Sequence, residues 1–421
     1  MSRVIPILPA GSLVGTRPAP RTSAPVGSLL TTLPPLSLYI HVPWCVKKCP
    51  YCDFNSHQSP SVVPEDQYLD ALQADLEQAL PSVWGRQVHT VFIGGGTPSL
   101  LSERAMDRLL SMLRAHLNIW PDAEITLEAN PGTTEAQKLK EYGRSGVNRI
   151  SLGIQSFDLK QLKGLGRIHD ADQARAAIEM AQAAVPRVNL DLMFALPQQT
   201  LQECLRDARE ALSFGTEHVS IYQLTIEPNT VFAKFPPSLP EDDLAVEMED
   251  AIEGACGEAG LERYEVSAFA RAGARARHNV NYWQFGDYLG LGPGAHGKLS
   301  FPDKIVRQAR VRSPETWMQT ALARDGTHIS ESRILDTQEL PFEFMLNALR
   351  LREGVSSNLY AERCGRAPTE FAGMLALAVK KGLLNGAADR YQATPLGWRF
   401  LNELQGIFLI EHYNSALRAL K

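Results

Sequence analysis

The stretch LSLYIHVPWCVKKCPYC, residues 36–52, places three cysteines directly after a short apolar run. Residues 36–42 have the length and the β-branched and aromatic composition of a buried strand. Cys45, Cys49 and Cys52 follow with C-x3-C-x2-C spacing, and the other three of the six cysteines stand alone. Six cysteines in 421 residues do not make a disulfide framework. The cluster therefore indicates a metal site in a reducing compartment.

The spacing of these thiols favours an iron–sulfur cluster. Three thiolates on one loop can bind three irons of a [4Fe–4S] cluster and leave the fourth iron without a protein ligand. Zinc is the alternative, with His41 or His57 as the fourth ligand, but the sequence lacks the second C-x2-C pair that structural zinc sites favour. A chance grouping of buried thiols is the third possibility.

Short apolar runs alternate with amphipathic stretches from residue 36 to about residue 224. The predicted strands are 36–42, 88–93, 124–129, 148–154, 188–194 and 218–224, and the helices between them include 64–80, 103–117 and 172–184. Such alternation predicts a parallel sheet that is covered on both faces. The predicted fold is α/β, a partial (β/α)6 TIM-like barrel, with a doubly wound open sheet as the alternative.

We place this barrel at residues 36–290 and expect two further regions. Residues 1–35 contain seven prolines and no acidic residue, which predicts a disordered Pro-rich tail rather than the amphipathic helix of a transit peptide. Residues 291–421 show a helical, winged-helix-like pattern, with helices at 341–351, 368–381 and 395–404 and a polar ribbon at 385–393. Because this region has few basic residues, a docking or lid role is favoured over DNA binding.

The overall composition excludes several classes of partner. Lys and Arg number 42 and Asp and Glu number 47, giving a net charge of −5, so bulk electrostatics do not favour nucleic acid. The apolar stretches are much shorter than the roughly 20 residues that cross a bilayer. We expect a cytoplasmic protein with no nucleic-acid partner and no transmembrane segment, and peripheral membrane contact is left open.

Further polar motifs occur where the predicted strands end. The run GGGTPS, residues 94–99, ends the second strand, and three glycines allow a ligand to approach the backbone closely. Glu128, Gln155 and Asp191 lie at the ends of later strands, and Arg167 lies in a following loop. Carboxyl ends of barrel strands converge on the mouth, where such folds carry their sites. Each residue could equally be an ordinary surface or buried polar group.

In combination these motifs resemble the radical S-adenosylmethionine (SAM) superfamily, and within it the oxygen-independent coproporphyrinogen III oxidase-like family. The resemblance covers about residues 36–415 and rests on YIHVPWC, GGGTPS, LEANP, GIQSF, LGRIH and DLMFALP. It implies a [4Fe–4S] cluster on the three clustered cysteines, with SAM on the open iron. It also implies SAM-binding positions at Tyr39, Tyr51, Gly96 and Glu128, and second-SAM positions of the oxidase at Thr97, Pro98, Gln155, Arg167 and Asp191. One departure is Ala195, where this family usually has glycine.

The same family contains an oxidase and a haem chaperone, and two features separate them. The oxidase pattern has a fourth cysteine two residues after the third, where this chain has Phe54. The segment RHNVNYW, residues 277–283, matches the H-N-x-x-Y-W signature of the chaperone. The resemblance therefore implies haem binding by His278, Asn279, Tyr282 and Trp283. Imidazole is a common axial ligand of haem iron, although a core histidine beside packed aromatics is the plainer interpretation.

The sequence thus predicts a haem chaperone that binds haem, one [4Fe–4S] cluster and SAM. The alternative is the oxidase, which converts coproporphyrinogen III propionates to vinyl groups, and a non-catalytic metal-binding protein is a third class. No catalytic residue is assigned. The implied partners are haem-acceptor proteins such as cytochromes and a reductant protein, flavodoxin or ferredoxin. Eight basic and two acidic residues between Arg271 and Arg312 would suit haem propionates, although a solvated basic face explains them almost as well.

Overall fold

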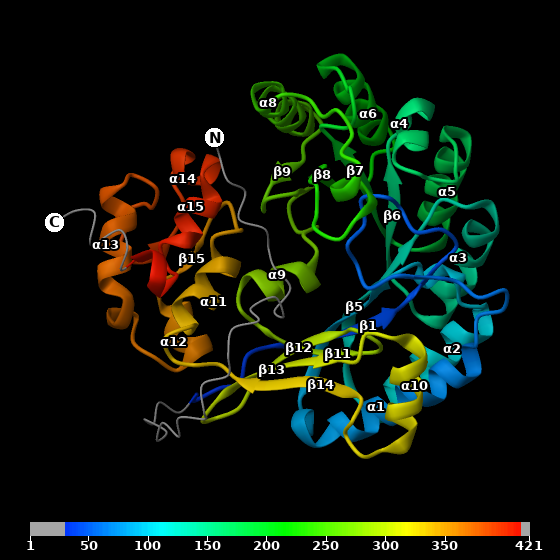
Figure 1. The fold of residues 1–421 in the computed structure, drawn as a ribbon, viewed down its shortest axis with the longest axis horizontal. Coiled ribbons are helices and arrows are strands. Elements are labelled where there is room, and N and C mark those ends of the chain that lie inside the picture. Colours follow the sequence, from blue (N-terminus) through cyan, green and yellow to red (C-terminus); the bar gives the residue numbers. More distant parts are fainter. Residues whose placement is uncertain (1–29, 414–421) are drawn as a thin grey trace.

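The computed structural model describes residues 30–413, except for the side chains of residues 133–137. Most of the predicted tail, residues 1–35, therefore lies outside the described residues. Within them, Figure 1 shows a barrel-like part built of strands and outer helices, beside a smaller helical part.

Six parallel strands form the centre of the fold, and they pair in chain order. They are β1 (Leu36–Val42), β4 (Gln87–Gly95), β5 (Asn118–Ala129), β6 (Arg149–Gln155), β7 (Arg187–Phe194) and β8 (His218–Gln223). Because the order never doubles back, the sheet is not doubly wound. The outer edges of β1 and β8 pair with other strands, so the barrel is partial, as predicted.

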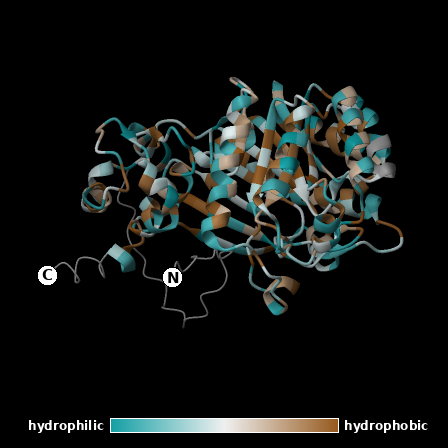
Figure 2. Cartoon of the chain, turned by 90° about the horizontal axis from the view of Figure 1, so that it is seen from above, coloured by the Kyte–Doolittle hydropathy of each residue, from teal (hydrophilic) through white to brown (hydrophobic). Residues whose placement is uncertain are grey.

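The outer face of this sheet is covered by helices (Figure 1). They are α1 (Glu65–Val83), α2 (Glu103–His116), α3 (Thr133–Ser145), α4 (Leu159–Gly164), α5 (Ala171–Ala184), α6 (Leu201–Ser213) and α8 (Asp242–Glu258). The 3-10 helix η1 (Pro98–Leu100) and the short helix α7 (Val231–Lys234) lie beside the cysteine loop instead. Capping boxes begin α5 at Asp170 and α6 at Thr200. Figure 2 shows hydrophobic residues concentrated on the central strands and the helix faces toward them.

Six further strands, all but β11 antiparallel to their neighbours, extend the sheet at both edges to twelve strands in total. Beside β8 lie β10 (Ala268–Ala270) and β9 (Glu262–Arg263), and beside β1 lie β11 (Asp287–Leu291), which is parallel to it, then β12 (His296–Ser300), β13 (Ile305–Arg310) and β14 (Ile329–Ile334). Helix α10 (Pro314–Ala323) packs on α1. The structure differs here from the expected helical region 291–421, because strands continue to Ile334.

Buried charges explain why β12 and β13 were not evident from the sequence. Lys298 lies 2.9 Å from Asp287, and both side chains are almost fully buried. Arg310 lies 3.1 Å from Asp75 of α1, again with both side chains buried. These charged residues interrupt the apolar pattern from which a buried strand is predicted.

The remaining helices pack around a second core formed by residues such as Phe344, Tyr360, Phe371 and Phe408. They are α11 (Leu340–Ala348), α12 (Asn358–Cys364), η2 (Pro368–Phe371), α13 (Ala372–Lys380), α14 (Pro395–Arg399) and α15 (Leu401–Gly406), with the short pair β15 (Val355–Ser356) and β16 (Arg390–Tyr391). Helix α9 (Arg277–Trp283) lies between this part and the barrel (Figure 1).

Asp75 provides a test of how the antiparallel strands are held. Its carboxylate is fully buried and contacts Arg310, His328 and Trp317. We expect Asp75→Asn to lower the free energy of unfolding by about 3–5 kcal/mol, because it leaves the buried Arg310 charge without its counter-ion. Urea unfolding followed by circular dichroism measures this loss.

The matched control is Asp66→Asn, since Asp66 pairs with Arg104 and Arg108 but is 64% exposed. We expect a change of less than about 1 kcal/mol there. Equal unfolding midpoints for the two variants would contradict the structural role of the buried pair.

Candidate functional site

The cysteine loop lies at the carboxyl end of β1 and is held by the short parallel strands β2 (Trp44–Cys45) and β3 (His57–Gln58). Cys45, Cys49 and Cys52 are half-buried free thiols. Burial raises the pKa of the Cys45 and Cys52 thiols, partly offset by the Ser56 hydroxyl. The Arg167 guanidinium donates to Cys49 Sγ at 3.7 Å.

The glycine run at the end of β4 passes directly beneath this loop. A Cβ atom at Gly96 would lie 2.5 Å from the carbonyl oxygen of Trp44, so only glycine fits there. The next residue, Thr97, donates its backbone N–H to the same carbonyl at 2.7 Å. Pro98 is buried and begins η1. The run therefore fixes the cysteine loop against the sheet.

Arg167 and Asn130 connect the loops that follow several strands. Arg167 Nη2 donates to Asn130 Oδ1 at 2.6 Å and to the Gly153 carbonyl at 2.7 Å. Asn130 Nδ2 in turn donates to Thr97 Oγ1 at 3.0 Å. Arg167 Nε is buried and has no hydrogen-bond partner. Sequence reasoning did not single out Asn130, although its place at the end of a predicted strand in LEANP was the available signal.

Two carboxylates lie inside the mouth of the barrel. Glu128 accepts a hydrogen bond from the Gly95 N–H at 3.0 Å, and burial together with Asp191 raises its pKa to about 7. Burial also raises the pKa of Asp191, although it accepts hydrogen bonds from Ser151 and Asn189. Two buried carboxylates that repel each other favour a cationic ligand. The ammonium and sulfonium groups of SAM fit this requirement.

The other predicted SAM-site residues lie around the same mouth. Tyr39 contacts His41 Nδ1 through its hydroxyl at 2.9 Å and stacks on Phe92. Tyr51 packs against Phe232 of α7. Gln155 ends β6 with a left-handed backbone, φ 68°, a strained conformation that is common at functional sites.

Two further features of the mouth concern residues outside that set. Burial and the Asp191 carboxylate raise the pKa of Tyr222 of β8, which is 42% exposed and which sequence reasoning missed. Ala195 has φ 54°, which explains the usual preference for glycine at this position.

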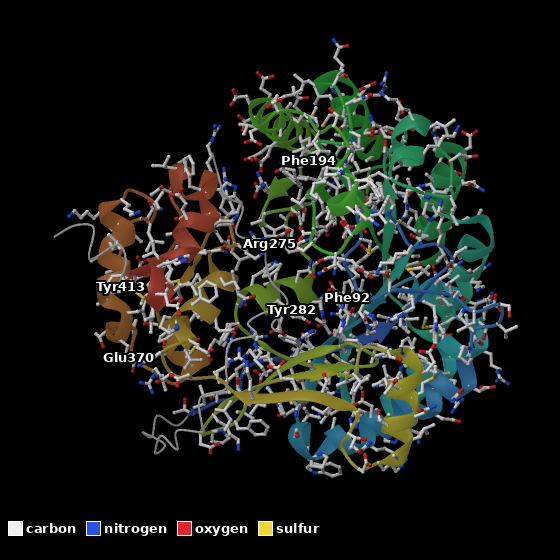
Figure 3. The ribbon with its side chains drawn as sticks, viewed as in Figure 1. Phe92, Phe194, Arg275, Tyr282, Glu370 and Tyr413 are labelled. Carbon is white, nitrogen blue, oxygen red and sulfur yellow. The ribbon has the colours of Figure 1, made fainter. Side chains whose placement is uncertain are left out.

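Helix α9 divides the predicted haem residues between two surroundings. His278 and Tyr282 lie four positions apart and share a face, with ring centroids 5.0 Å apart. His278 also packs on Phe92 of β4, inside the barrel. Tyr282 and Phe92 are labelled near the middle of the molecule in Figure 3. Trp283 instead lies against Arg350 of the C-terminal part, 4.3 Å from its guanidinium carbon, and Asn279 is half-buried.

Four of the eight basic residues that would suit propionates form ion pairs within the fold. Lys298 and Arg310 form the buried ion pairs described above. Arg275 pairs with Glu353, and Arg307 pairs with Glu343. Arg271, Arg277, Lys304 and Arg312 are exposed, so only half of the basic residues in this segment remain on the surface to meet a negatively charged group.

Comparisons with known proteins identify the family of this chain. Residues 39–211 match the Radical SAM superfamily, and residues 335–400 match the HemN C-terminal domain. The heme chaperone HemW of Escherichia coli (strain K12) is 47% identical over 91% of this chain and its own full length. The HemW of Bacillus subtilis is 35% identical over 89% of this chain and 99% of its own. A Bos taurus protein, radical S-adenosyl methionine domain-containing protein 1, mitochondrial, is 38% identical over 76% and 74%.

A solved structure shares the fold over nearly the whole chain. The radical SAM coproporphyrinogen III oxidase HemN of Escherichia coli superposes with a TM-score of 0.77 and 22% sequence identity, covering 90% of this chain and 91% of that one. This likeness confirms the predicted architecture. In residues 30–413, no helix has both the length and the apolar character needed to cross a membrane.

The cysteine loop makes a first prediction for this site. We expect Cys45→Ser, Cys49→Ser or Cys52→Ser to abolish uptake of iron and sulfide on anaerobic reconstitution, because each removes one of three thiolate ligands. The controls are alanine variants of the buried cysteines outside the loop, Cys204, Cys256 and Cys364. Loss of iron uptake in those variants, or its persistence in a loop variant, would contradict the assignment.

The raised pKa of Glu128 predicts a pH-dependent affinity for SAM. Its carboxyl is largely ionised at pH 7.5 and largely protonated at pH 6, given the pKa of about 7. We expect SAM to bind roughly five- to tenfold more weakly at pH 6, because the negative charge that attracts the ammonium group is lost. Calorimetric titration of the reconstituted protein measures this ratio.

The control is Glu128→Gln, which keeps the size of the side chain and removes its titration. This variant should bind SAM weakly at both pH values. A pH dependence as steep as that of the unmodified protein would show that another group is responsible.

Proposed function

Because this chain belongs to the HemW family of radical SAM proteins, we propose that it is a haem chaperone, which binds haem and delivers it to acceptor proteins. The superfamily implies a [4Fe–4S] cluster and SAM, and the donor set at the barrel mouth fits both groups. Cys45, Cys49 and Cys52 would hold the cluster. When bound, such a cluster can supply one electron to SAM.

The protein's own residues around the mouth would bind and orient SAM. Glu128 and Asp191 offer negative charge for its ammonium and sulfonium groups. Arg167 offers an unpartnered Nε–H for its carboxylate. The backbone N–H groups of Gly96 and Thr97 hold the start of the cysteine loop against the sheet beside this site.

One observation carries the haem assignment, namely the unpartnered Nε2 of His278. This imidazole is buried, 3% exposed, and its Nε2 has no hydrogen-bond partner. Its Nδ1 lies 2.8 Å from Thr90 Oγ1, whose hydroxyl donates to Ser37 Oγ at 2.8 Å. Thr90 therefore accepts from Nδ1–H, which leaves a lone pair on Nε2. Buried polar atoms are rarely without a partner, so a ligand for this lone pair is expected.

The electrostatics and neighbours of His278 suit haem iron. Burial, with a smaller effect of the Arg149 charge, lowers its pKa to about 3, so the ring stays neutral in the physiological range. Neutral imidazole is the form that binds iron. Phe92 and Tyr282 offer flat apolar faces beside it. The four haem residues predicted from the sequence, His278, Asn279, Tyr282 and Trp283, all lie on α9, but Trp283 faces away from the imidazole, so the site at His278 is proposed without it.

The surface around the cysteine loop supports the proposed electron donor. Val46, Lys47 and Lys48 are exposed on this loop, and the Phe54 ring is 60% exposed beside it. A positive and partly apolar surface suits an acidic redox protein such as a flavodoxin or ferredoxin. The six free cysteines agree with a reducing compartment, and we propose the cytoplasm.

Haem titration tests the proposal. We expect His278→Ala to weaken haem binding by more than about tenfold, and Thr90→Val by about tenfold, because the threonine orients the imidazole. The Soret band of titrated haem gives both affinities and reports the loss of the axial ligand.

Two controls make the result specific. His296→Ala removes an exposed imidazole of β12 and should leave the affinity unchanged. The variant that lacks all three loop cysteines should still bind haem. Equal affinity of His278→Ala and the unmodified protein would reject His278 as the ligand.

A further inference from the structure

A large cleft lies between the barrel and the C-terminal helices, on a different side of α9 from His278. Its volume is about 1100 Å³, and residues from α8, β9, α9, α11, α14 and α15 line it. Figure 1 shows these elements around the junction of the two parts. Trp283 lines the cleft, whereas His278 packs on Phe92 inside the barrel. Five positions separate these residues, which places them on different faces of the helix.

The cleft contains hydrogen-bond donors that lack acceptors. Trp283 Nε1 is buried and has no partner, and the same holds for Nε of Arg350, which stacks on the Trp283 ring. Nε of Arg263, a side chain only 7% exposed, is also without a partner. Such groups cost free energy unless a ligand satisfies them. The missing ligand must bring acceptors, and a carboxylate is the strongest acceptor for arginine.

Among the arginines that line the cleft, Arg350 has the longest distance to its carboxylate partner. Its nearest carboxylate is Glu265, at 3.6 Å. The other arginines that line the cleft have closer partners, namely Arg263 with Glu249 at 2.6 Å, Arg399 with Asp250 at 3.1 Å and Arg352 with Glu253 at 3.3 Å. Arg350 is therefore the one best placed to bind an added carboxylate.

We propose that this cleft is a second site for haem, where a propionate binds Arg350 and the ring lies against Trp283. The ligand's identity rests on the proposed function, and the site itself on the cleft's own chemistry. Its volume is at the upper end of small-molecule sites and accommodates a macrocycle. Haem held there is accessible to an acceptor protein, whereas a ligand at His278 is enclosed. The cleft is thus the place where haem enters and leaves.

The residues that line the cleft lack the usual protein ligands of haem iron. They include no histidine, cysteine or methionine, so haem iron has no soft or imidazole ligand in it. Binding to the cleft depends on the carboxylates and the flat ring and not on the metal. Metal-free protoporphyrin IX is therefore the probe that reports the cleft without the His278 site.

Fluorescence titration of protoporphyrin IX into the full-length protein tests the proposal. We expect Arg350→Met to weaken its binding by about tenfold or more, because a charge-assisted contact is lost. Trp283→Leu should weaken it as well. The control is Arg275→Met, since Arg275 also stacks on an aromatic ring, Tyr264, but lies outside the cleft. Figure 3 labels it at the junction of the two parts.

A second titration compares two forms of the porphyrin. The dimethyl ester of protoporphyrin IX lacks the charged carboxylates, and we expect the unmodified protein to bind it at least tenfold more weakly than the acid. Arg350→Met should not discriminate between acid and ester. Equal binding of acid and ester by the unmodified protein, or no effect of Arg350→Met, would overturn the cleft site.

These outcomes are distinct from those that test His278. If His278→Ala leaves haem binding intact while Arg350→Met weakens protoporphyrin binding, the cleft stands and the proposed iron ligand is wrong. If the reverse holds, the iron ligand stands and the cleft proposal is overturned.

Discussion

The parallel pairing of six strands in chain order is the constraint on which the candidate site depends. It turns the carboxyl end of every strand to one edge, so loops far apart in sequence meet there. The cysteine loop follows β1, the glycine run ends β4, and Glu128 and Gln155 lie at the ends of β5 and β6. The mouth is rich in polar groups, and buried carboxylates are tolerated because hydrogen bonds and the nearby Arg149 partly compensate them.

On the open side of the barrel, added strands and helix α9 connect the barrel to the C-terminal helices. Antiparallel strands extend the sheet there, and the buried pairs Asp75–Arg310 and Asp287–Lys298 fix them to it. Helix α9 then separates the barrel interior from the cleft beside the C-terminal helices. One short motif thereby presents an imidazole on one side and an indole on the other. A protein that must both hold haem and release it can use these two surroundings differently.

The apolar strands and the motif residues could be predicted from the sequence, and the polar connections between them could not. Residues 36–42 were predicted as a strand with the bounds that β1 has, because seven residues of suitable composition stand between clear breaks. Strands β12 and β13 were missed because buried Lys298 and Arg310 resemble surface residues until their counter-ions are known. Strand β14 was missed because its pattern alternates exposed and half-buried residues without a buried apolar face. Asn130 and Arg350 act through partners that lie 37 and 67 positions away in sequence, Arg167 and Trp283. Contacts between residues so far apart in sequence cannot be predicted from a local sequence pattern.

The transfer of haem to an acceptor is the most direct measurement of the central claim. Full-length protein, loaded with haem and carrying its reconstituted cluster, would be mixed with an apo-cytochrome, and the acceptor's Soret band would be followed. We expect the acceptor to gain haem while this protein loses it. We also expect the same preparation, given SAM and a reductant, to leave coproporphyrinogen III unchanged. Decarboxylation of coproporphyrinogen III without haem transfer would contradict it.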